Sequence, residues 1–330
     1  MTILLTGASG FMGLAVCEAL LARGEHVVGL DLSPAPAAAK RVFSLQPGRY
    51  EFAAGDMRDS VLVRQTIRAF GADRIIHLAA VTADAARERR DPTSVFEVNV
   101  LGTLNLLTAA HEAGVGRIVH VSSGSVYGTS GRTPALLRED ETPLAPEGLY
   151  GISKLTAEAA AVRLADLHGL DLAIGRLGTC FGPWEYATSA RDTPSAPLQI
   201  LLSALHGQSV TIDRPHRRDF LYSRDGAAAI LALLDAPLLS RRIYNLAAGF
   251  VWTLEAFCAG LAIRHLGLDF HIQAPGTIAL YADYDRAAMD MERLRTDTGF
   301  IPLFDLDAAL DDYLPWFKAN SDLFLETSAP

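Results

Sequence analysis

The chain has 330 residues, half of them hydrophobic, which is enough for one large α/β unit or for two packed lobes. Its 38 acidic and 29 basic residues give a net charge of -9, whereas nucleic-acid-binding proteins carry a basic excess. We therefore expect no nucleic-acid partner. The chain has no uncharged apolar stretch of about 18 residues, so we expect no membrane partner. It begins with MTILLTGASG, which has no basic leader, and its only three cysteines are scattered, so we expect a cytoplasmic protein with reduced thiols and no metal site.

The N-terminal segment ILLTGASGFMGLAVCEALLARG has the pattern of a strand, a tight turn and a helix. Ile3 to Thr6 is a short apolar run, and apolar residues at helical spacing continue up to Gly24. Gly7, Gly10 and Gly13 lie between them at G-x-x-G-x-x-G spacing. Such glycines let the strand turn sharply, let backbone N–H groups approach a pyrophosphate, and let helix and strand pack closely. The segment therefore predicts a dinucleotide-binding loop.

The second predicted strand, EHVVGLD, ends in Asp31, 24 residues after Gly7. An acid at this distance is placed to bond the 2′-hydroxyl of an adenosine ribose, and it would repel a 2′-phosphate. We therefore expect NAD, rather than NADP, as the cofactor.

The rest of the chain alternates between strand and helix patterns. Further strands are expected at residues 50–55, 72–80, 116–123, 170–178 and 241–249, helices at 95–114, 149–169 and 304–320, and loops at 33–40 and 182–197. His77 is expected to be a packed core histidine. The pattern predicts an α/β fold, a Rossmann-type doubly wound parallel sheet with a smaller interleaved C-terminal substrate lobe. We expect the NAD-binding domain at 1–178 plus about 221–248, and the lobe at about 179–220 and 249–330.

Tyr150 and Lys154 lie four residues apart on an alanine-rich helical segment, so they share one helix face. A lysine ammonium beside a phenol stabilises the phenolate, and we expect it to lower the pKa of the tyrosine from its reference value of about 10. Such a tyrosine can take a proton from an alcohol while hydride leaves the carbon. The strand at 116–123 ends in serines at the sheet edge where open α/β sheets bind ligands, and a serine hydroxyl there can bond the same oxygen.

An ordered set of segments resembles the extended short-chain dehydrogenase/reductases, the group of NAD-dependent sugar epimerases and dehydratases. The segments are, in chain order, TGASGFMG, GDMRD, HLAA, NVLGTLNLL, VSSGSVYG, YGISK, GRLGTCFGP, RRDFLYSRDGAAAI and YNLAAG. The resemblance implies that Tyr150 is the general acid/base, that Ser123 supplies the catalytic hydroxyl, and that Lys154 binds the nicotinamide ribose. The NAD-binding residues that it implies, with their neighbours, are Gly7, Gly10, Phe11, Met12, Gly13, Asp31, Leu32, Asp56, Met57, Leu78, Ala79, Ala80, Thr82, Asn99, Val121, Tyr150, Lys154 and Leu177.

The residues expected at the substrate are Thr82, Ser123, Ser125, Thr179, Trp184 and Arg218. Arg218 matches the arginine that meets a nucleotide phosphate in relatives, whereas its neighbours Arg214, His216 and Arg217 are interpreted as a solvated turn. The loop expected at 182–197 carries three aromatic or basic side chains, Trp184, Tyr186 and Arg191. They either line a substrate pocket or pack between the lobes, and the sequence leaves both alternatives open.

Departures from the family pattern bear on the reaction. Dehydratases of this family carry an Asp-Glu pair just after the catalytic hydroxyl, at the positions of Gly124 and Ser125 in this chain. Decarboxylating members carry a Glu at the position of Ser125. Without these acids both reactions lose an acid/base group. Nucleotide-sugar enzymes also carry an Asn where this chain has Thr179, which weakens the expectation of a large nucleotide-sugar substrate.

Three functions remain open. The first is an NAD-dependent oxidoreductase/epimerase of a sugar-type secondary alcohol, in the manner of a nucleotide-sugar 4-epimerase. The second is net oxidation by NAD of a small sugar, sugar acid or polyol, and the third is an NAD(H)-binding scaffold without turnover. The family also implies a homodimer through the helices that hold Asn99 and Tyr150, with Ala157, Ala160, Ala161 and Leu164 on the dimer face.

Overall fold

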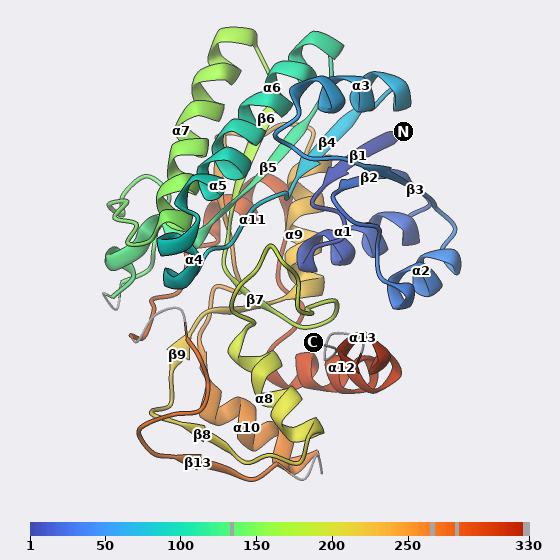
Figure 1. The fold of residues 1–330 in the computed structure, drawn as a ribbon. Helices are drawn as coiled ribbons and strands as arrows, with labels where there is room; N and C mark the ends of the chain where they lie inside the picture. Colours follow the sequence, from blue (N-terminus) through green and yellow to red (C-terminus); the bar gives the residue numbers. More distant parts are fainter. Residues whose placement is uncertain (133–134, 265–267, 281–283, 326–330) are drawn as a thin grey trace.

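The computed structural model describes residues 1–132, 135–264, 268–280 and 284–325, and its centre is a seven-stranded sheet (Figure 1). The strand order is β11-β6-β5-β4-β1-β2-β3, and all the neighbours pair in parallel. The strands are β1 (Thr2–Thr6), β2 (His26–Asp31), β3 (Arg49–Ala54), β4 (Arg74–His77), β5 (Ile118–Ser123), β6 (Leu172–Leu177) and β11 (Ile243–Leu246). The predicted Rossmann-type parallel sheet is confirmed.

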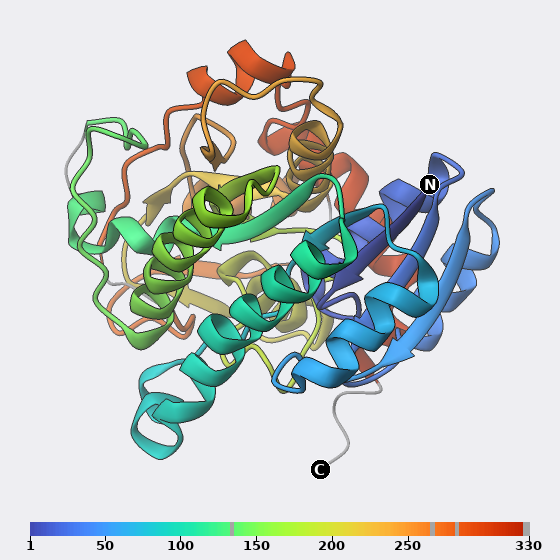
Figure 2. The same ribbon diagram turned by 90° about the horizontal axis from the view of Figure 1, so that it is seen from above.

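Helices cover both faces of the sheet because its strands are apolar on both sides. Ile3 and Leu5 of β1 pack into one buried cluster, whereas Leu4 packs into the other. The helices α1 (Phe11–Ala22) and α9 (Ser223–Asp235) pack against each other on the first side. On the second side lie α3 (Ser60–Phe70), α6 (Gly102–Ala113) and α7 (Leu149–His168), which Figure 2 shows side by side.

The strand order creates a crevice between β1 and β4. From β1 the chain moves outward to β2 and β3, and it then returns to β4 on the other side of β1. The loops that follow β1 and β4 therefore diverge, and a crevice opens between them at the carboxyl edge of the sheet. Gly7 turns the chain there with a φ of +68°, and a Cβ on it would lie 2.7 Å from the backbone nitrogen of Ala79.

The remaining elements lie mostly beyond the carboxyl edge of the sheet, below it in Figure 1. They are the short strands β7 (Thr179–Phe181), β8 (Val210–Ile212), β9 (Arg217–Arg218), β10 (Phe220–Tyr222), β12 (Trp252–Thr253) and β13 (Phe270–Ile272), and the helices α8 (Ala196–Leu205), α10 (Leu254–Ile263), α11 (Glu292–Thr298), α12 (Leu306–Ala319) and α13 (Asp322–Leu325). Phe181 joins several of them, since its ring contacts Phe220, Trp252 and Tyr313. The predicted domain bounds stay a prediction.

Two sequence expectations about local structure need correction. The stretch at 33–40 is not a loop throughout, because α2 (Ala37–Ser44) begins inside it and buries Ala38, Ala39 and Phe43. The single helix expected at 95–114 is instead α5 (Pro92–Phe96), a π-helical turn η1 (Glu97–Leu101) and α6 in succession. The expected closing helix is confirmed as α12, and His77 is buried as expected.

A buried ion pair fixes α7 to the sheet. Arg176 of β6 and Glu158 of α7 lie 2.9 Å apart, and both side chains are almost fully buried. Ser122 donates to Glu158 at 2.5 Å, and Arg176 also donates to Tyr127 at 3.1 Å. Each charge is therefore hydrogen-bonded as well as paired, which a buried ion pair requires.

Other features follow from burial. The three cysteines are buried and free, which confirms the expected thiols. Ala157 and Ala161 were expected on a dimer face, but both are fully buried within the chain, because that side of α7 packs inward. Within the described residues, no helix is both long and apolar enough to cross a bilayer.

Candidate active site

The phosphate loop is open where an anion would sit. Gly10 is the N-cap of α1, no side chain caps that helix, and the first N–H groups of a helix lack partners within it. A Cβ on Gly10 would touch only the carbonyl oxygen of Gly7, at 3.3 Å, whereas a Cβ on Gly13 would collide with the backbone of Gly7 and Ala8. Gly13 therefore serves close packing, and Gly10 leaves the helix N-terminus accessible to a phosphate, next to Phe11 and Met12.

Asp31 is fixed at the end of β2, beside this loop. Its two carboxylate oxygens accept from the backbone nitrogens of Ser9 at 2.9 Å and Leu32 at 2.7 Å. Burial raises the pKa of this carboxyl, and the backbone hydrogen bonds oppose the rise. An oriented carboxylate with lone pairs to spare suits ribose hydroxyls, so the residues at this end fit an adenosine.

The residues expected around the adenine follow the next strand. Asp56 pairs with Arg58 at 2.7 Å, and Met57 is buried beneath Gly102 of α6. Leu32, in contrast, is 66% exposed. Leu32 follows the carboxyl end of β2, and Asp56 and Met57 follow that of β3, which is the neighbour of β2 in the sheet.

The hydroxyl groups of Ser123, Ser125 and Thr82 gather near Tyr150, the tyrosine predicted to be the general acid/base. Ser123 ends β5 and donates to Ser125 at 3.1 Å. Tyr150 lies in the first turn of α7, and its phenol is hydrogen-bonded by Ser123 and Thr82. Lys154 lies one turn later and donates from Nζ to the backbone oxygen of Val121 at 2.8 Å. Proton transfer requires a substrate hydroxyl within hydrogen-bond reach of the Tyr150 oxygen, and Ser123 and Tyr150 are the groups here that can bond such a hydroxyl.

The pKa of Tyr150 differs from what the sequence led us to expect. Burial raises the pKa of Tyr150, although the hydrogen bonds from Ser123 and Thr82 and the charge of Arg191 act to lower it. The expected lowering by Lys154 is therefore wrong for the polypeptide alone. Burial also lowers the pKa of Lys154 to about 8, opposed by the charge of Glu158.

Asn99 holds the two sides of the site together. Its side-chain oxygen accepts from the nitrogen of Val81 at 2.8 Å, and its amide donates to the oxygen of Val81 at 3.0 Å and to Ser153 at 2.9 Å. Ser153 belongs to α7, whereas Val81 follows β4. Asn99 lies in the π-helical turn η1, a form of helix that is frequent at functional sites.

A small cavity lies beside Arg191, the arginine whose charge acts on Tyr150. Its wall includes the predicted residues Thr179 and Arg218, together with Arg191, His216 and Tyr284. His216 was expected in a solvated turn but is buried, and its ring pairs with Asp213.

Arg218, which lines this cavity, and Arg286, whose charge acts on it, are both half-buried arginines. Burial, with the nearby charge of Arg286, lowers the pKa of Arg218 to about 10, and burial also lowers the pKa of Arg286. Arg286 donates to the backbone oxygen of Gly124, next to Ser123, and its Nε has no partner among the described residues. Guanidinium groups in such a position can bind an anionic group through charge-assisted hydrogen bonds. The sequence reasoning missed Arg286, since it lies 162 residues from Gly124 and in no motif.

The three side chains whose role was left open take different places. Trp184 is fully buried, donates to Glu18 at 2.7 Å and packs on Trp316. Its interpretation as a substrate residue is not supported, because it fills the core between the sheet helices and α12. Tyr186 donates to the backbone oxygen of Ser9 at 2.6 Å. Arg191 lines the cavity.

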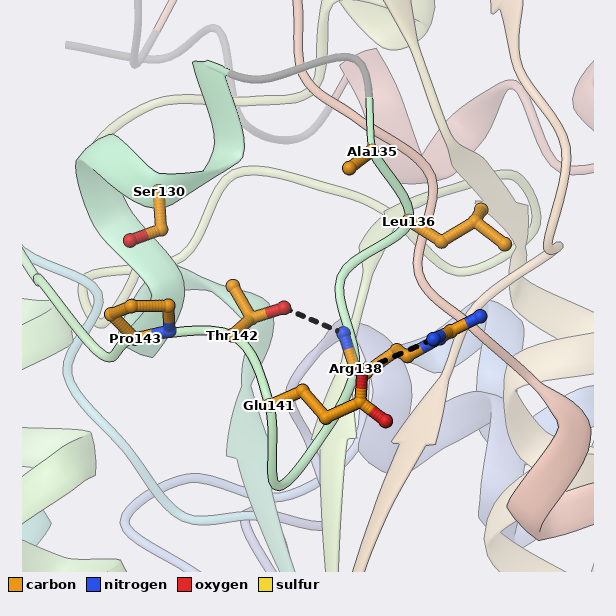
Figure 3. Close-up of a pocket in the computed structure, with 7 residues that line it drawn as sticks. All are labelled: Ser130, Ala135, Leu136, Arg138, Glu141, Thr142 and Pro143. Atoms are coloured by element: carbon orange, nitrogen blue, oxygen red, sulfur yellow. Dashed lines mark hydrogen bonds and ion pairs between the residues drawn. The ribbon is translucent and has the colours of Figure 1, made fainter.

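A second hollow, shown in Figure 3, is formed by a single surface segment. Ser130, Leu136, Arg138 and Pro143 are among its walls, and a hydrogen bond of 2.8 Å from the nitrogen of Arg138 to Thr142 closes one side. Because none of the predicted site residues lines it, we do not assign it to the active site.

Comparison with known proteins agrees with this geometry. Residues 3–247 match the model of the NAD dependent epimerase/dehydratase family. The chain belongs to this family. The expected resemblance, the NAD-dependent chemistry and the enzymatic class are thereby confirmed.

Individual members of the NAD-dependent epimerase/dehydratase family resemble the chain along its whole length. It is 30% identical to a dTDP-glucose 4,6-dehydratase of Streptomyces niveus, over 97% of this chain and 94% of the relative. It is 28% identical to a UDP-glucose 4-epimerase of Mycolicibacterium smegmatis, over 97% of this chain and 100% of the relative. The chain also resembles the crystal structure of DesIV, a dTDP-glucose 4,6-dehydratase of Streptomyces venezuelae that was solved with NAD bound. The two structures match with a TM-score of 0.82 at 26% sequence identity, over 98% of this chain and 99% of DesIV.

Alanine substitutions at two glycines should separate binding from folding. Gly13→Ala forces a Cβ into the Gly7 backbone, so we expect it to lower stability by about 1–3 kcal/mol. Gly10→Ala should fold normally but bind NAD at least about tenfold more weakly, because its Cβ stands at the helix N-terminus. Thermal unfolding and calorimetric NAD titration of both variants test this. Wild-type affinity in Gly10→Ala would contradict the assigned phosphate site.

Lys154 gives a pH-dependent stability. Its pKa is about 8 in the folded chain against 10.5 ordinarily, so the unfolded chain keeps the proton to higher pH. The buried charge therefore costs stability below about pH 8, and the cost disappears as the pH rises toward 10.5. Relative to Lys154→Met, the wild type should gain up to about 3 kcal/mol across this range in urea unfolding. The exposed Lys318→Met serves as the control, and a difference independent of pH at Lys154 would refute the assignment.

Proposed function

We propose that the chain is a nucleotide-sugar 4-epimerase-like enzyme that oxidises and re-reduces one sugar carbinol. The observation that carries this proposal is the combination of Ser123, Tyr150 and Lys154 with Gly124 and Ser125. The first three provide the proton-transfer group of an alcohol oxidation. At the other two positions no carboxyl group is present to eliminate water, although dehydratases are among the relatives.

The residues around the cofactor site have separate tasks. NAD, when bound, takes a hydride from a carbinol carbon and can return it. Gly10 and the N-terminus of α1 hold the pyrophosphate, Asp31 holds the adenosine ribose, and Lys154 holds the nicotinamide ribose. Lys154 needs only a small movement for this, since its Nζ now bonds the backbone oxygen of Val121 at the end of β5.

The protons move through the substrate side of the same group. The ionised phenolate oxygen of Tyr150 takes the proton of the sugar hydroxyl as the C–H bond breaks, while the Ser123 hydroxyl bonds the same oxygen. Because burial raises the pKa of Tyr150 in the polypeptide, this ionised form needs the positive charges of Lys154 and of bound NAD. The resulting ketone turns over in the site, and the return of hydride to its other face is accompanied by return of the proton from Tyr150. Because Gly124 and Ser125 carry no acid, the neighbouring C–O bond stays intact.

The two half-buried arginines support a charged substrate. A nucleotide sugar carries a pyrophosphate, and guanidinium groups that lack acidic partners bind phosphate oxygens with charge-assisted hydrogen bonds. Among the residues that the structure describes, the Arg218 guanidinium donates only to the backbone oxygen of Tyr284, at 3.5 Å. We therefore assign Arg218 and Arg286 to the phosphate groups of the substrate.

A second candidate is net oxidation of a small sugar acid or polyol by NAD. It is favoured by Thr179, which replaces the Asn of nucleotide-sugar enzymes, and by the small size of the cavity that Thr179 lines. In this reaction NADH leaves after each turnover.

One incubation distinguishes the two candidates. The chain with NAD is given UDP- and dTDP-sugars or free sugar acids, and both sugar inversion, by NMR, and NADH absorbance are followed. We expect inversion of a nucleotide sugar without sustained NADH release. Tyr150→Phe should lower turnover at least about a hundredfold and still bind NAD, because only the proton transfer is lost. Sustained NADH formation from a free sugar would overturn the proposal, and full turnover in Tyr150→Phe would support a scaffold.

We further propose a cytoplasmic homodimer that forms through α6 and α7. Free thiols suit a reducing compartment. Leu101, at the end of η1 just before α6, is 52% exposed, and Ile152 and Leu167 of α7 are 36% and 56% exposed. Leu167→Glu should convert the dimer to monomer in light scattering, since a buried carboxylate opposes association. Leu303→Glu, at a leucine that is 80% exposed elsewhere, is the control. A monomeric wild type at micromolar concentration would exclude the dimer.

A further inference from the structure

The segment from Trp184 to Ser195, here called the strap, crosses the crevice between β1 and β4. It connects β7 with α8 and lies in the middle of Figure 1, between the sheet and the elements below it. Near one end, Tyr186 donates to the backbone oxygen of Ser9 in the phosphate loop at 2.6 Å. Near the other, the nitrogen of Thr82 donates to Ala190 at 2.7 Å. Ser9 follows β1 and Thr82 follows β4, so the strap spans the opening between the two loops.

An arginine clamps the far end of the strap. Arg87 of α4 (Ala85–Arg90) donates to both carboxylate oxygens of Asp192, at 2.6 and 2.7 Å, and to the backbone oxygen of Ser189 at 2.5 Å. The nitrogen of Asp84 donates to the same carboxylate at 3.1 Å. Both charged side chains are more than four-fifths buried, at 17% and 16% exposure. A two-pronged pair of this kind is strong and directional.

The near end of the strap is fixed by a second buried acid. Glu185 is 1% exposed and accepts from the nitrogen and the hydroxyl of Ser195 at 2.6 and 2.5 Å. It also pairs with Arg191 at 3.1 Å, and the Arg191 guanidinium lies 5.4 Å over the ring of Phe11 at the start of α1. The strap therefore presents a cation to the front of the phosphate loop.

We propose that the strap is the front wall of the dinucleotide site and that Arg87 with Asp192 is its latch, so that NAD stays on the enzyme from one turnover to the next. A dinucleotide that runs from Asp31 past Gly10 to Tyr150 and Lys154 has to pass between the sheet edge and the strap, because Tyr186 and Thr82 tie the strap down on either side. It leaves only when one of these ties opens. The inference rests on the proposed function, and a retained cofactor suits a reaction that returns its hydride to the same substrate.

The position of α4 determines which residue tests the latch. Glu88, next to Arg87, accepts from the nitrogen of Leu149 at 2.6 Å at the start of the catalytic helix α7. A change at Arg87 can therefore disturb Tyr150 through α4, whereas a change at Asp192 acts on the strap side. Asp192→Asn keeps the shape of the side chain and removes the charge.

The test measures release of the cofactor rather than activity. The protein is loaded with radiolabelled NAD and chased with unlabelled NAD, and the retained label is followed over time. We expect Asp192→Asn to release NAD at least about tenfold faster than the wild type, because it loses charge-assisted hydrogen bonds that hold the strap closed. Tyr186→Phe, which removes one hydrogen bond at the other end, should speed release about threefold. The double exchange Arg87→Asp with Asp192→Arg should restore much of the retention.

The outcomes separate this proposal from the proposed function. Arg89→Met, on the exposed side of α4, is the matched control and should release NAD like the wild type. Equal release rates in all variants, or faster release in Arg89→Met as well, would overturn the latch and leave the epimerase assignment standing. Failure of the wild type to bind NAD would overturn the proposed function itself. Thermal unfolding of each variant identifies any that do not fold. If Asp192→Asn is among them, the release rate of Tyr186→Phe decides the test.

Discussion

The divergence of the chain on the two sides of β1 determines where every functional group of this protein lies. β1 is hydrogen-bonded to β2 on one side and to β4 on the other, so the loops after β1 and β4 leave the sheet in different directions. At Gly7 the two loops come so close that only a glycine fits against Ala79, and beyond it they separate. Asp31 follows from the pairing with β2, and the position of Ser123 follows from the pairing of β4 with β5. The proposed cofactor path and the position of the proposed catalytic hydroxyl, that of Ser123, are thus consequences of one strand order.

Charge is distributed unevenly around this crevice. Glu158, which is the nearest acid to Lys154 on α7, is committed to Arg176 and Ser122. Its charge only partly offsets the burial that lowers the pKa of Lys154. At the small cavity, burial lowers the pKa of both Arg218 and Arg286, and the charge of Arg286 lowers the pKa of Arg218 further. The charges of Asp285 and Asp219 partly offset these two cations, and phosphate groups of a ligand would offset them further.

The sequence predicted the parts of the site whose residues lie close together along the chain. The glycine loop, Asp31 and the Tyr150–Lys154 pair have fixed spacings that follow from the geometry of a turn or a helix, and the structure places them accordingly. Arg286 could not be found in this way, since its approach to Gly124 depends on how the last third of the chain folds back over β5. Trp184 failed for a related reason, because an aromatic side chain in an irregular stretch has no period that distinguishes a pocket from a core. The raised pKa of Tyr150 depends on burial, which no local pattern reports.

The loss of the dehydratase acids extends beyond the two positions where they would stand. A Cβ on Gly124 would lie 3.1 Å from the sulfur of Met289 and 3.5 Å from Nη2 of Arg286. A carboxylate introduced there would therefore meet a half-buried guanidinium and form an ion pair with it. Such a pair holds the carboxyl ionised, whereas a general acid has to carry a proton at neutral pH. Arg286 would therefore hold a carboxyl at position 124 in its ionised form, which is unsuited to the general-acid step of water elimination.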